Sequence, residues 1–231
     1  VQSLISDISH QARTPMANVL LYALLLEESG LTEAQRARLA PLQAQAGKLH
    51  FLLENLLRAS RLETGLLQLA PAEGPVDGLL EQAAAQAGAA ALQQGVALAV
   101  QPCGAAACFD ARWTAEALDN LVDNAVKYTP SGGRVTLSAA LTESFCRVDV
   151  ADTGPGIPES EQGAVFNRFA RGSAARGVEG LGIGLYLARQ IAAGQGGYIR
   201  VRSAPGQGSV FSLYLPRRSS AKGATVAHGD A

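Results

Sequence analysis

Apolar residues recur at helical spacing over the first quarter of the chain. Over 1–28 they follow one another by three or four residues, or by the sum of these steps, at Ile5, Ile8, Ala12, Val19 and Leu26. A second heptad seam runs on to Glu63 and comprises Leu39, Leu42, Ala46, Leu49, Leu53 and Leu56. This spacing gives each segment one apolar face and predicts two long helices.

Turn and capping residues separate the two predicted helices. Ser29-Gly30 ends the first, and Thr32 with Gln35 has the spacing of a capping box for the second. Two helices joined by a short loop form an antiparallel hairpin. Further leucines, Leu20, Leu21, Leu24 and Leu25, widen the apolar surface. We therefore expect two hairpins to pair into a dimeric four-helix bundle.

Beyond the hairpin the pattern changes to shorter, mixed elements. Pro71, Gly74 and Pro75 predict a linker over 67–76. The predicted helices cover 79–94, 112–128 and 185–193, and the predicted strands cover 96–100, 107–109, 134–141, 146–151, 198–202 and 210–215. This order predicts an α+β two-layer sandwich with helices on one face of a mixed sheet. The expected domains are 1–66 and 77–216, followed by a disordered tail over 217–231.

Composition narrows the class of protein. The formal net charge is -1, which argues against a nucleic-acid partner. The apolar run over 19–26 is shorter than the ~20 residues that span a bilayer. Three cysteines without metal-like spacing favour buried, reduced thiols in the cytoplasm, and a Cys103–Cys108 disulfide across a hairpin is the alternative.

His10 lies off the apolar seam of the first helix. Its helical neighbours are the polar residues Ser6, Asp7, Arg13 and Thr14. We expect its imidazole to be reachable by another molecule. From these residues alone, however, a solvated surface histidine is the better interpretation. His50 and His228 are expected to have no chemical role.

Further candidates for chemistry lie more than a hundred residues downstream. Asn120, Asn124 and Lys127 follow one another by four and three positions, so they share one face of a helix. Amide oxygens suit Mg²⁺, and a lysine neutralises phosphate oxygens. A solvated helix face is the alternative interpretation.

Two glycine-containing segments flank a small, polar stretch over 170–179 that we interpret as a mobile lid. Asp152 follows a predicted strand directly, where it can accept a hydrogen bond from a planar base, and the glycines after it let the backbone approach a ring. The glycines over 180–184 precede a helix, whose N-terminal amides make an anion site. Phe166 and Phe169 are candidate anchors for the near end of the lid, with core packing as the alternative.

Taken together and in this order, the motifs resemble the catalytic core of a sensor histidine kinase from a two-component system. The resemblance covers 1–216. The motif segments are Ser9-His10-Gln11-Ala12-Arg13-Thr14-Pro15, Asn120-Leu121-Val122-Asp123-Asn124-Ala125, Asp152-Thr153-Gly154-Pro155-Gly156, Phe166-Asn167-Arg168-Phe169, Gly180-Leu181-Gly182-Ile183-Gly184-Leu185 and Gly206-Gln207-Gly208-Ser209.

The resemblance implies that ATP and Mg²⁺ are the cofactors. Asp152 is then expected to bind the adenine amine, Asn124 and Asn120 to hold Mg²⁺, Lys127 to contact phosphate, and Tyr128 to lie near the base. Gly180, Gly182 and Gly184 are expected to form the hinge and phosphate end of the lid. The other residues expected at the nucleotide are Gly154, Gly156, Ile157, Phe169, Leu181, Leu185 and Ser209, the last as a support for Asp152.

The resemblance also implies partners and a mechanism. His10 is expected to take the γ-phosphoryl group of ATP and pass it to an aspartate on the receiver domain of a response regulator, within a homodimer. Gln11 stands where the family more often has a carboxylate, which predicts slower transfer, and Thr14 makes phosphatase activity an expectation. The chain begins in mid-helix, so we expect the cytoplasmic portion of a plasma-membrane sensor whose spans precede it.

Two alternatives share parts of this pattern. Chaperone and mismatch-repair ATPases have the same ATP-binding fold but need no acceptor histidine, and the hairpin bearing His10 argues against them. A degenerate kinase that acts as a scaffold or phosphatase is the other, and the intact Asn124, Asp152 and glycine motifs argue against it.

Overall fold

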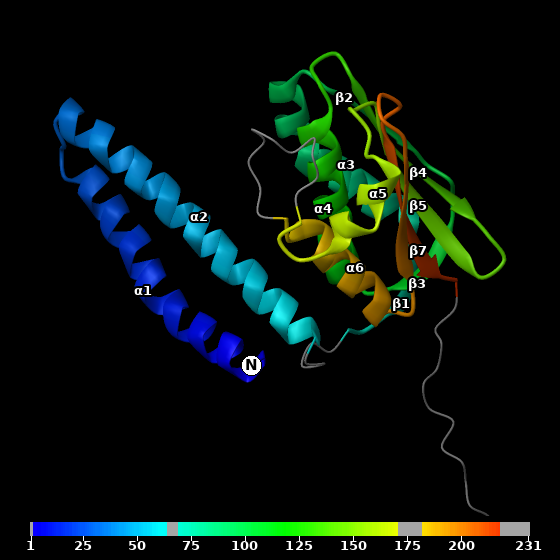
Figure 1. Ribbon diagram of the computed structural model, residues 1–231, viewed down its shortest axis with the longest axis horizontal. Coiled ribbons are helices and arrows are strands. Elements are labelled where there is room, and N and C mark those ends of the chain that lie inside the picture. The colour runs from blue at the N-terminus through cyan, green and yellow to red at the C-terminus, as the bar shows by residue number, and fades with distance from the viewer. Residues whose placement is uncertain (1, 64–68, 171–181, 218–231) are drawn as a thin grey trace, which may run out of the picture. The chain divides into compact units, whose positions relative to one another are not determined.

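A computed structural model describes residues 2–63, 69–170 and 182–217, with the backbone alone described over 2–14 and 51–63 (Figure 1). The chain divides into two compact units, Val1–Gln68 and Leu69–Ala231. The first is a helical hairpin and the second an α/β unit. Within the described ranges, no helix combines the length and hydrophobicity needed to cross a bilayer.

The hairpin consists of α1 (Gln2–Glu28) and α2 (Glu33–Glu63). The predicted capping box is confirmed, because the backbone N–H of Thr32 donates to Gln35 Oε1 at 2.9 Å and the backbone N–H of Gln35 donates to Thr32 Oγ1 at 3.4 Å. Across the hairpin, Gln43 Nε2 donates to the Ala23 carbonyl at 3.3 Å. The two helices are therefore antiparallel neighbours, as predicted.

Over 15–50, where its side chains are described, a single hairpin leaves several bulky apolar residues about half-exposed. Ala23 and Ala46 are 2% and 8% exposed and lie between the helices. The larger seam residues Val19, Leu26 and Leu42 are 43%, 51% and 52% exposed. Small residues thus let the helices approach, while these three bulky side chains stay about half-exposed.

The α/β unit alternates short strands and helices. Its first half contains β1 (Ala72–Pro75), α3 (Val76–Gln94), β2 (Ala97–Gln101), β3 (Ala106–Phe109) and α4 (Ala111–Tyr128). Its second half contains β4 (Arg134–Leu141), β5 (Phe145–Asp152), α5 (Glu159–Gln162), the 3-10 turn η1 (Ala164–Phe166), α6 (Gly184–Gly194), β6 (Tyr198–Ser203) and β7 (Ser209–Pro216).

The main sheet has the strand order β2-β4-β5-β7-β6. The β2–β4 pair is parallel and the other three pairs are antiparallel, so the sheet is mixed as predicted. Helices α3, α4 and α6 cover one face (Figure 1). The core between the layers is made of fully buried side chains, among them Leu80, Leu118, Leu121, Leu137, Leu187, Ile191, Leu213 and Leu215.

The predicted linker over 67–76 is wrong for its second half. Residues 72–75 form β1, which pairs antiparallel with β3 in a separate two-stranded sheet. Gly74 permits this pairing, because a Cβ at that position would lie 3.2 Å from the Phe109 ring. Proline and glycine, which normally indicate a linker, here allow close packing on an aromatic ring.

The cysteine predictions are confirmed in part. All three thiols are free, which excludes the alternative Cys103–Cys108 disulfide in this structure. β2 and β3 belong to different sheets, so these two residues do not face each other across a hairpin. Cys108 and Cys146 are buried as expected, but Cys103 is exposed. Burial raises the pKa of the Cys146 thiol to about 11.

Candidate functional site

Helix α4 presents two carboxamides beside its buried face. Asp110 begins the helix by accepting a hydrogen bond from the backbone N–H of Trp113 at 3.1 Å. Asn120 Nδ2 donates to the Glu116 carbonyl at 2.8 Å, and Asn124 Nδ2 donates to the Asn120 carbonyl at 2.7 Å. Because the amide nitrogens bind their own helix, the amide oxygens are the atoms that these half-buried side chains offer to a ligand.

The N-terminus of α6 lies against the same face of α4. A Cβ at Gly184 would lie 2.6 Å from Asn120 Oδ1, so glycine lets the two helices approach at this point. Gly182 has a φ of 67°, and its α-carbon lies so close to the Ala170 carbonyl that a side chain would clash there. Ala170 and Gly182, which flank 171–181, are therefore in contact and lie next to Asn120.

Asp152 is held at the end of β5 by backbone donors from two segments. Its Oδ1 accepts from the N–H of Gly154 at 2.8 Å and from the N–H of Ser209 at 3.2 Å. These two backbone bonds fix the carboxyl plane and both go to Oδ1. Burial raises the pKa of Asp152 and outweighs the lowering effect of these hydrogen bonds.

Ser203 organises this end of the sheet and had not been singled out from the sequence. Its Oγ accepts from the N–H of Ile157 at 2.8 Å, donates to the Gly208 carbonyl at 2.7 Å and lies 3.0 Å from Ser209 Oγ. It therefore ties the turn after Asp152 to the start of β7. No local pattern marks Ser203, because its role depends on its pairing with Ser209 across β6 and β7.

Glycine is required in the turn after Asp152. Gly156 has a φ of 73°, and a side chain there would clash with the Ala204 carbonyl. A Cβ at Gly154 would lie 2.9 Å from both Asp152 Oδ1 and the Tyr128 carbonyl. The turn thus packs directly against the C-terminus of α4, which brings Asp152 near Tyr128.

The two phenylalanines beside 171–181 differ in their environment. Phe166 is 6% exposed and packs edge-on against Phe211, with ring centroids 6.2 Å apart. Phe169 is 58% exposed and has a φ of 60°, which is unusual for a residue with a side chain. The alternative interpretation, core packing, therefore fits Phe166 but not Phe169.

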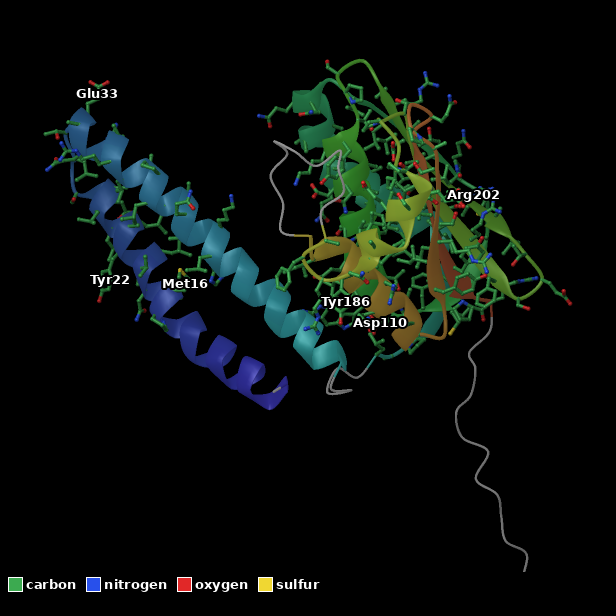
Figure 2. The ribbon with its side chains drawn as sticks, viewed as in Figure 1. Met16, Tyr22, Glu33, Asp110, Tyr186 and Arg202 are labelled. Atoms are coloured by element: carbon green, nitrogen blue, oxygen red, sulfur yellow. The ribbon has the colours of Figure 1, made fainter. Side chains whose placement is uncertain are left out.

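Between these rings, Arg168 contacts helix α6. Its guanidinium lies 4.9 Å from the centroid of the Tyr186 ring, and Nη2 donates to the Tyr186 hydroxyl at 3.2 Å. Tyr186 belongs to α6 and is 8% exposed (Figure 2). This contact, absent from the sequence predictions, holds the segment around Phe169 to α6.

The remaining predicted residues fall into two groups. Lys127 and Tyr128 occupy the last turn of α4 and are half-buried, as are Ile157 and Leu185. The expected roles of Gly180 and Leu181, and most of the expected lid, lie outside the described residues. The side chains of His10, Gln11 and Thr14 lie outside them as well, although all three residues belong to α1.

The donor atoms at the site suit a hard cation held by oxygen ligands. Over the described part of the chain, histidine, cysteine, aspartate and glutamate do not gather in groups of three or more that could hold a metal ion. The amide oxygens of Asn120 and Asn124 fit Mg²⁺, which commonly keeps several waters and phosphate oxygens among its ligands. A zinc or iron centre is not indicated among these residues.

Two family models match the chain. The model described as the His Kinase A (phospho-acceptor) domain matches residues 1–65. The model described as histidine kinase-, DNA gyrase B- and HSP90-like ATPase matches residues 109–219. The first covers the hairpin and the second covers α4 and all the glycine motifs.

Individual proteins show the same likeness over most of the chain. Sensor protein DivL of Caulobacter vibrioides is 35% identical over 92% of this chain and 27% of its own length. The histidine-protein kinase/phosphatase MprB of Mycobacterium sp. (strain KMS) is 34% identical over 93% of this chain and 43% of its own. The chain thus spans less than half the length of these curated relatives.

The solved structure of full-length ShkA in complex with AMPPNP aligns with a TM-score of 0.84 and 30% sequence identity. The alignment covers 95% of this chain and 47% of that one. Both units of the chain therefore have counterparts in one solved protein.

Proposed function

The chain belongs to the sensor histidine kinases as a catalytic core of that family, and we propose that it phosphorylates its own His10 from Mg-ATP. We propose that it binds ATP and acts as a protein histidine kinase in two-component signalling, which both family models support. The acceptor residue, the metal, the dimer and the transfer to a regulator are further parts of the proposal.

The observation that carries the proposal is the geometry around Asp152. Pairing of β5 with β7 places Ser209 beside Asp152, and the turn at Gly154 supplies the second donor to the same carboxylate oxygen. The other oxygen can then accept from an exocyclic amine, as adenine presents. Gly154 and Gly156 let the turn that presents Asp152 pack closely against the Tyr128 and Ala204 carbonyls.

The phosphate end of the site lies along α4. Asn124 and Asn120 would hold Mg²⁺ through their amide oxygens, and the ion would neutralise charge on the transferring phosphoryl group. Lys127 would contact phosphate from the last turn of the helix. Phosphoryl transfer depends chiefly on such positioning and charge neutralisation, and little covalent chemistry is required of the protein.

His10 would act as the nucleophile. The lone pair on Nε2 forms the new N–P bond while the bond from the γ-phosphorus to the bridging oxygen breaks, and ADP leaves with that electron pair. The Gln11 amide oxygen would accept a hydrogen bond from Nδ1–H and so fix the tautomer. An amide cannot take the proton, which therefore passes to water.

The phosphoryl group would then move to an aspartate on the receiver domain of a response regulator. We place a homodimer at the hairpin, since its bulky apolar residues are half-exposed in a single chain. Thr14, one helical turn after His10, would orient a water molecule for dephosphorylation of the regulator. This portion of the protein would act in the cytoplasm, beside a membrane reached through a preceding segment.

The test is transfer of γ-labelled phosphate from Mg-ATP, followed by addition of purified receiver domains and excess unlabelled ATP. We expect acid-labile, base-stable label on the wild-type chain that moves to a receiver domain. Asn124→Ala should abolish labelling, while Asp123→Ala, on the exposed face of the same helix, should retain it. Equal labelling of the Asn124 and Asp123 variants would contradict the assigned ATP site.

A further inference from the structure

The face of the main sheet that is turned away from the helices carries arginine and aromatic side chains. Successive residues of a strand point to opposite faces. On β5, Cys146, Val148 and Val150 are at most 1% exposed and point toward the helices, so Arg147 and Asp149 point to the other side. Figure 2 places Arg202 on that side and Tyr186 on the helical side.

Three aromatic rings cluster at one end of this face. Tyr198 and Tyr214, which are paired across β6 and β7, stack with centroids 4.3 Å apart and an interplanar angle of 13°. Phe145 meets both edge-on, at 5.3 Å from Tyr198 and 6.2 Å from Tyr214. The Arg200 guanidinium lies 5.2 Å from the Tyr198 ring centroid. The cluster is therefore preorganised by contacts between its own members.

The charge on this face is positive. Among the described residues of β5, β6 and β7 that point to this side, the one carboxylate is that of Asp149, which is 8% exposed. It accepts from Arg147 Nε at 2.9 Å and from Ser212 Oγ at 2.6 Å. Arg200 and Arg202 are exposed on the edge strand β6, and within the described residues neither pairs with a carboxylate. The charge of Asp149 is thus neutralised by Arg147, and Arg200 and Arg202 can bind a ligand.

We propose that this arginine–aromatic face, made of Phe145, Arg147, Tyr198, Arg200, Arg202 and Tyr214, docks an acidic segment of a partner protein. Arginine presents a planar fork of donors that matches a carboxylate at two points. Arginine and tyrosine also dominate the energetics of protein interfaces. The chain as a whole carries a net charge of -1, so the positive charge here is a local concentration.

A nucleic acid fits this face less well. Bases stack on open aromatic ring faces. Tyr214 stacks on one face of the Tyr198 ring, and the Arg200 guanidinium lies 5.2 Å from its centroid, so this ring is already engaged by its neighbours. The docking face also lies across the sheet from α4, so the proposal does not depend on ATP or on His10.

The experiment measures binding of a fluorescein-labelled glutamate–serine repeat peptide to the full chain by fluorescence anisotropy at about 0.1 M salt. Arg200→Glu/Arg202→Glu is compared with Arg36→Glu/Arg38→Glu, which changes charge equally at two exposed positions of α2. We expect the β6 variant to bind at least about tenfold more weakly than wild type, and the α2 variant to bind within about twofold of it.

A conservative variant separates shape from charge. Arg200→Lys/Arg202→Lys keeps the charge but loses the planar fork, so its affinity should lie between those of wild type and the glutamate variant. Thermal melting checks that each variant is folded. Absence of peptide binding by wild type, or equal weakening in both glutamate variants, would overturn the proposal. Tighter binding of an oligothymidylate than of the peptide would also overturn it.

Discussion

The bulky apolar residues of the hairpin and of the α/β unit differ in burial. In the hairpin, Val19, Leu26 and Leu42 are 43%, 51% and 52% exposed. In the α/β unit, Leu121 and Leu137 are fully buried. One chain therefore supplies a complete core to the second unit, whereas over 15–50 of the first unit the buried apolar residues are the alanines Ala23 and Ala46. The proposed dimer would give the hairpin its missing layer.

The largest effect is expected from a charge placed in the hairpin seam. Leu42→Glu would bury two unpaired carboxylates per dimer at a cost of several kcal/mol. The dimer dissociation constant should then rise roughly a thousandfold, since each 1.4 kcal/mol is a factor of ten. Sedimentation equilibrium should show a monomer, while the matched variant Leu92→Glu, at a residue that is 83% exposed on α3, should stay dimeric.

A second pair of variants compares the two cores directly. Leu121→Ala removes a fully buried side chain and should lower the free energy of unfolding of the α/β unit by about 2–5 kcal/mol. Leu42→Ala should change it by less than about 0.5 kcal/mol, because that side chain is half-exposed in the other unit. Fluorescence of Trp113, the single tryptophan, follows denaturation of α4 selectively. A larger loss of unfolding free energy in Leu42→Ala than in Leu121→Ala would contradict this difference between the two units.

Local sequence signals predicted the elements well and their long-range pairing less well. The capping box at Thr32, for example, is decided within a few residues. The pairing of β1 with β3 is not local, and Pro71 with Gly74 gave the pattern of a linker. Residues 72–75 can therefore be assigned to a strand only when their pairing with β3 is known.

The same limit applies to the candidate site. Helical spacing alone placed Asn120 and Asn124 together on α4. The contact between Asp152 and Ser209 spans 57 residues and arises from strand pairing, so the sequence offered it only through a family resemblance. Ser203 and the Arg168–Tyr186 contact have no local signature. These residues were found only from the tertiary structure.

The raised pKa of Asp152 predicts how ATP affinity depends on pH. The ionised carboxylate is the better acceptor for an adenine amine, so affinity should fall by up to about tenfold per pH unit as pH drops through the raised pKa. The pKa of Asp152 is higher in the folded than in the unfolded chain, so its contribution to the free energy of unfolding is fully present below the unfolded pKa. This contribution is lost as pH rises through the folded pKa.

Titration calorimetry with ATP across acidic and neutral pH checks this dependence. Protonation of ATP itself affects every variant alike, so the informative quantity is the difference between variants. Asp152→Asn should lose the additional decline at low pH, whereas Asp123→Asn, at an exposed residue of α4, should keep it. An identical pH profile for Asp152→Asn and wild type would show that Asp152 does not accept from the ligand.

The smallest effect is expected beside the proposed acceptor. Gln11→Glu should accelerate autophosphorylation by about three- to tenfold, because a charged acceptor forms a hydrogen bond about twice as strong as a neutral one. Initial rates of labelling at several pH values measure this. Gln45→Glu, at an exposed position of α2, controls for the added charge. An unchanged rate in Gln11→Glu would mean that this position does not limit transfer.

We propose that the hairpin supplies the phosphoryl acceptor and the α/β unit binds the nucleotide. Incubating wild type, His10→Ala and His50→Ala with γ-labelled Mg-ATP and measuring acid-labile label tests this division. His50, a second histidine of the hairpin, is the matched control. We expect label on wild type and His50→Ala and none on His10→Ala. Label that persists in His10→Ala, or that is lost in His50→Ala instead, would contradict it.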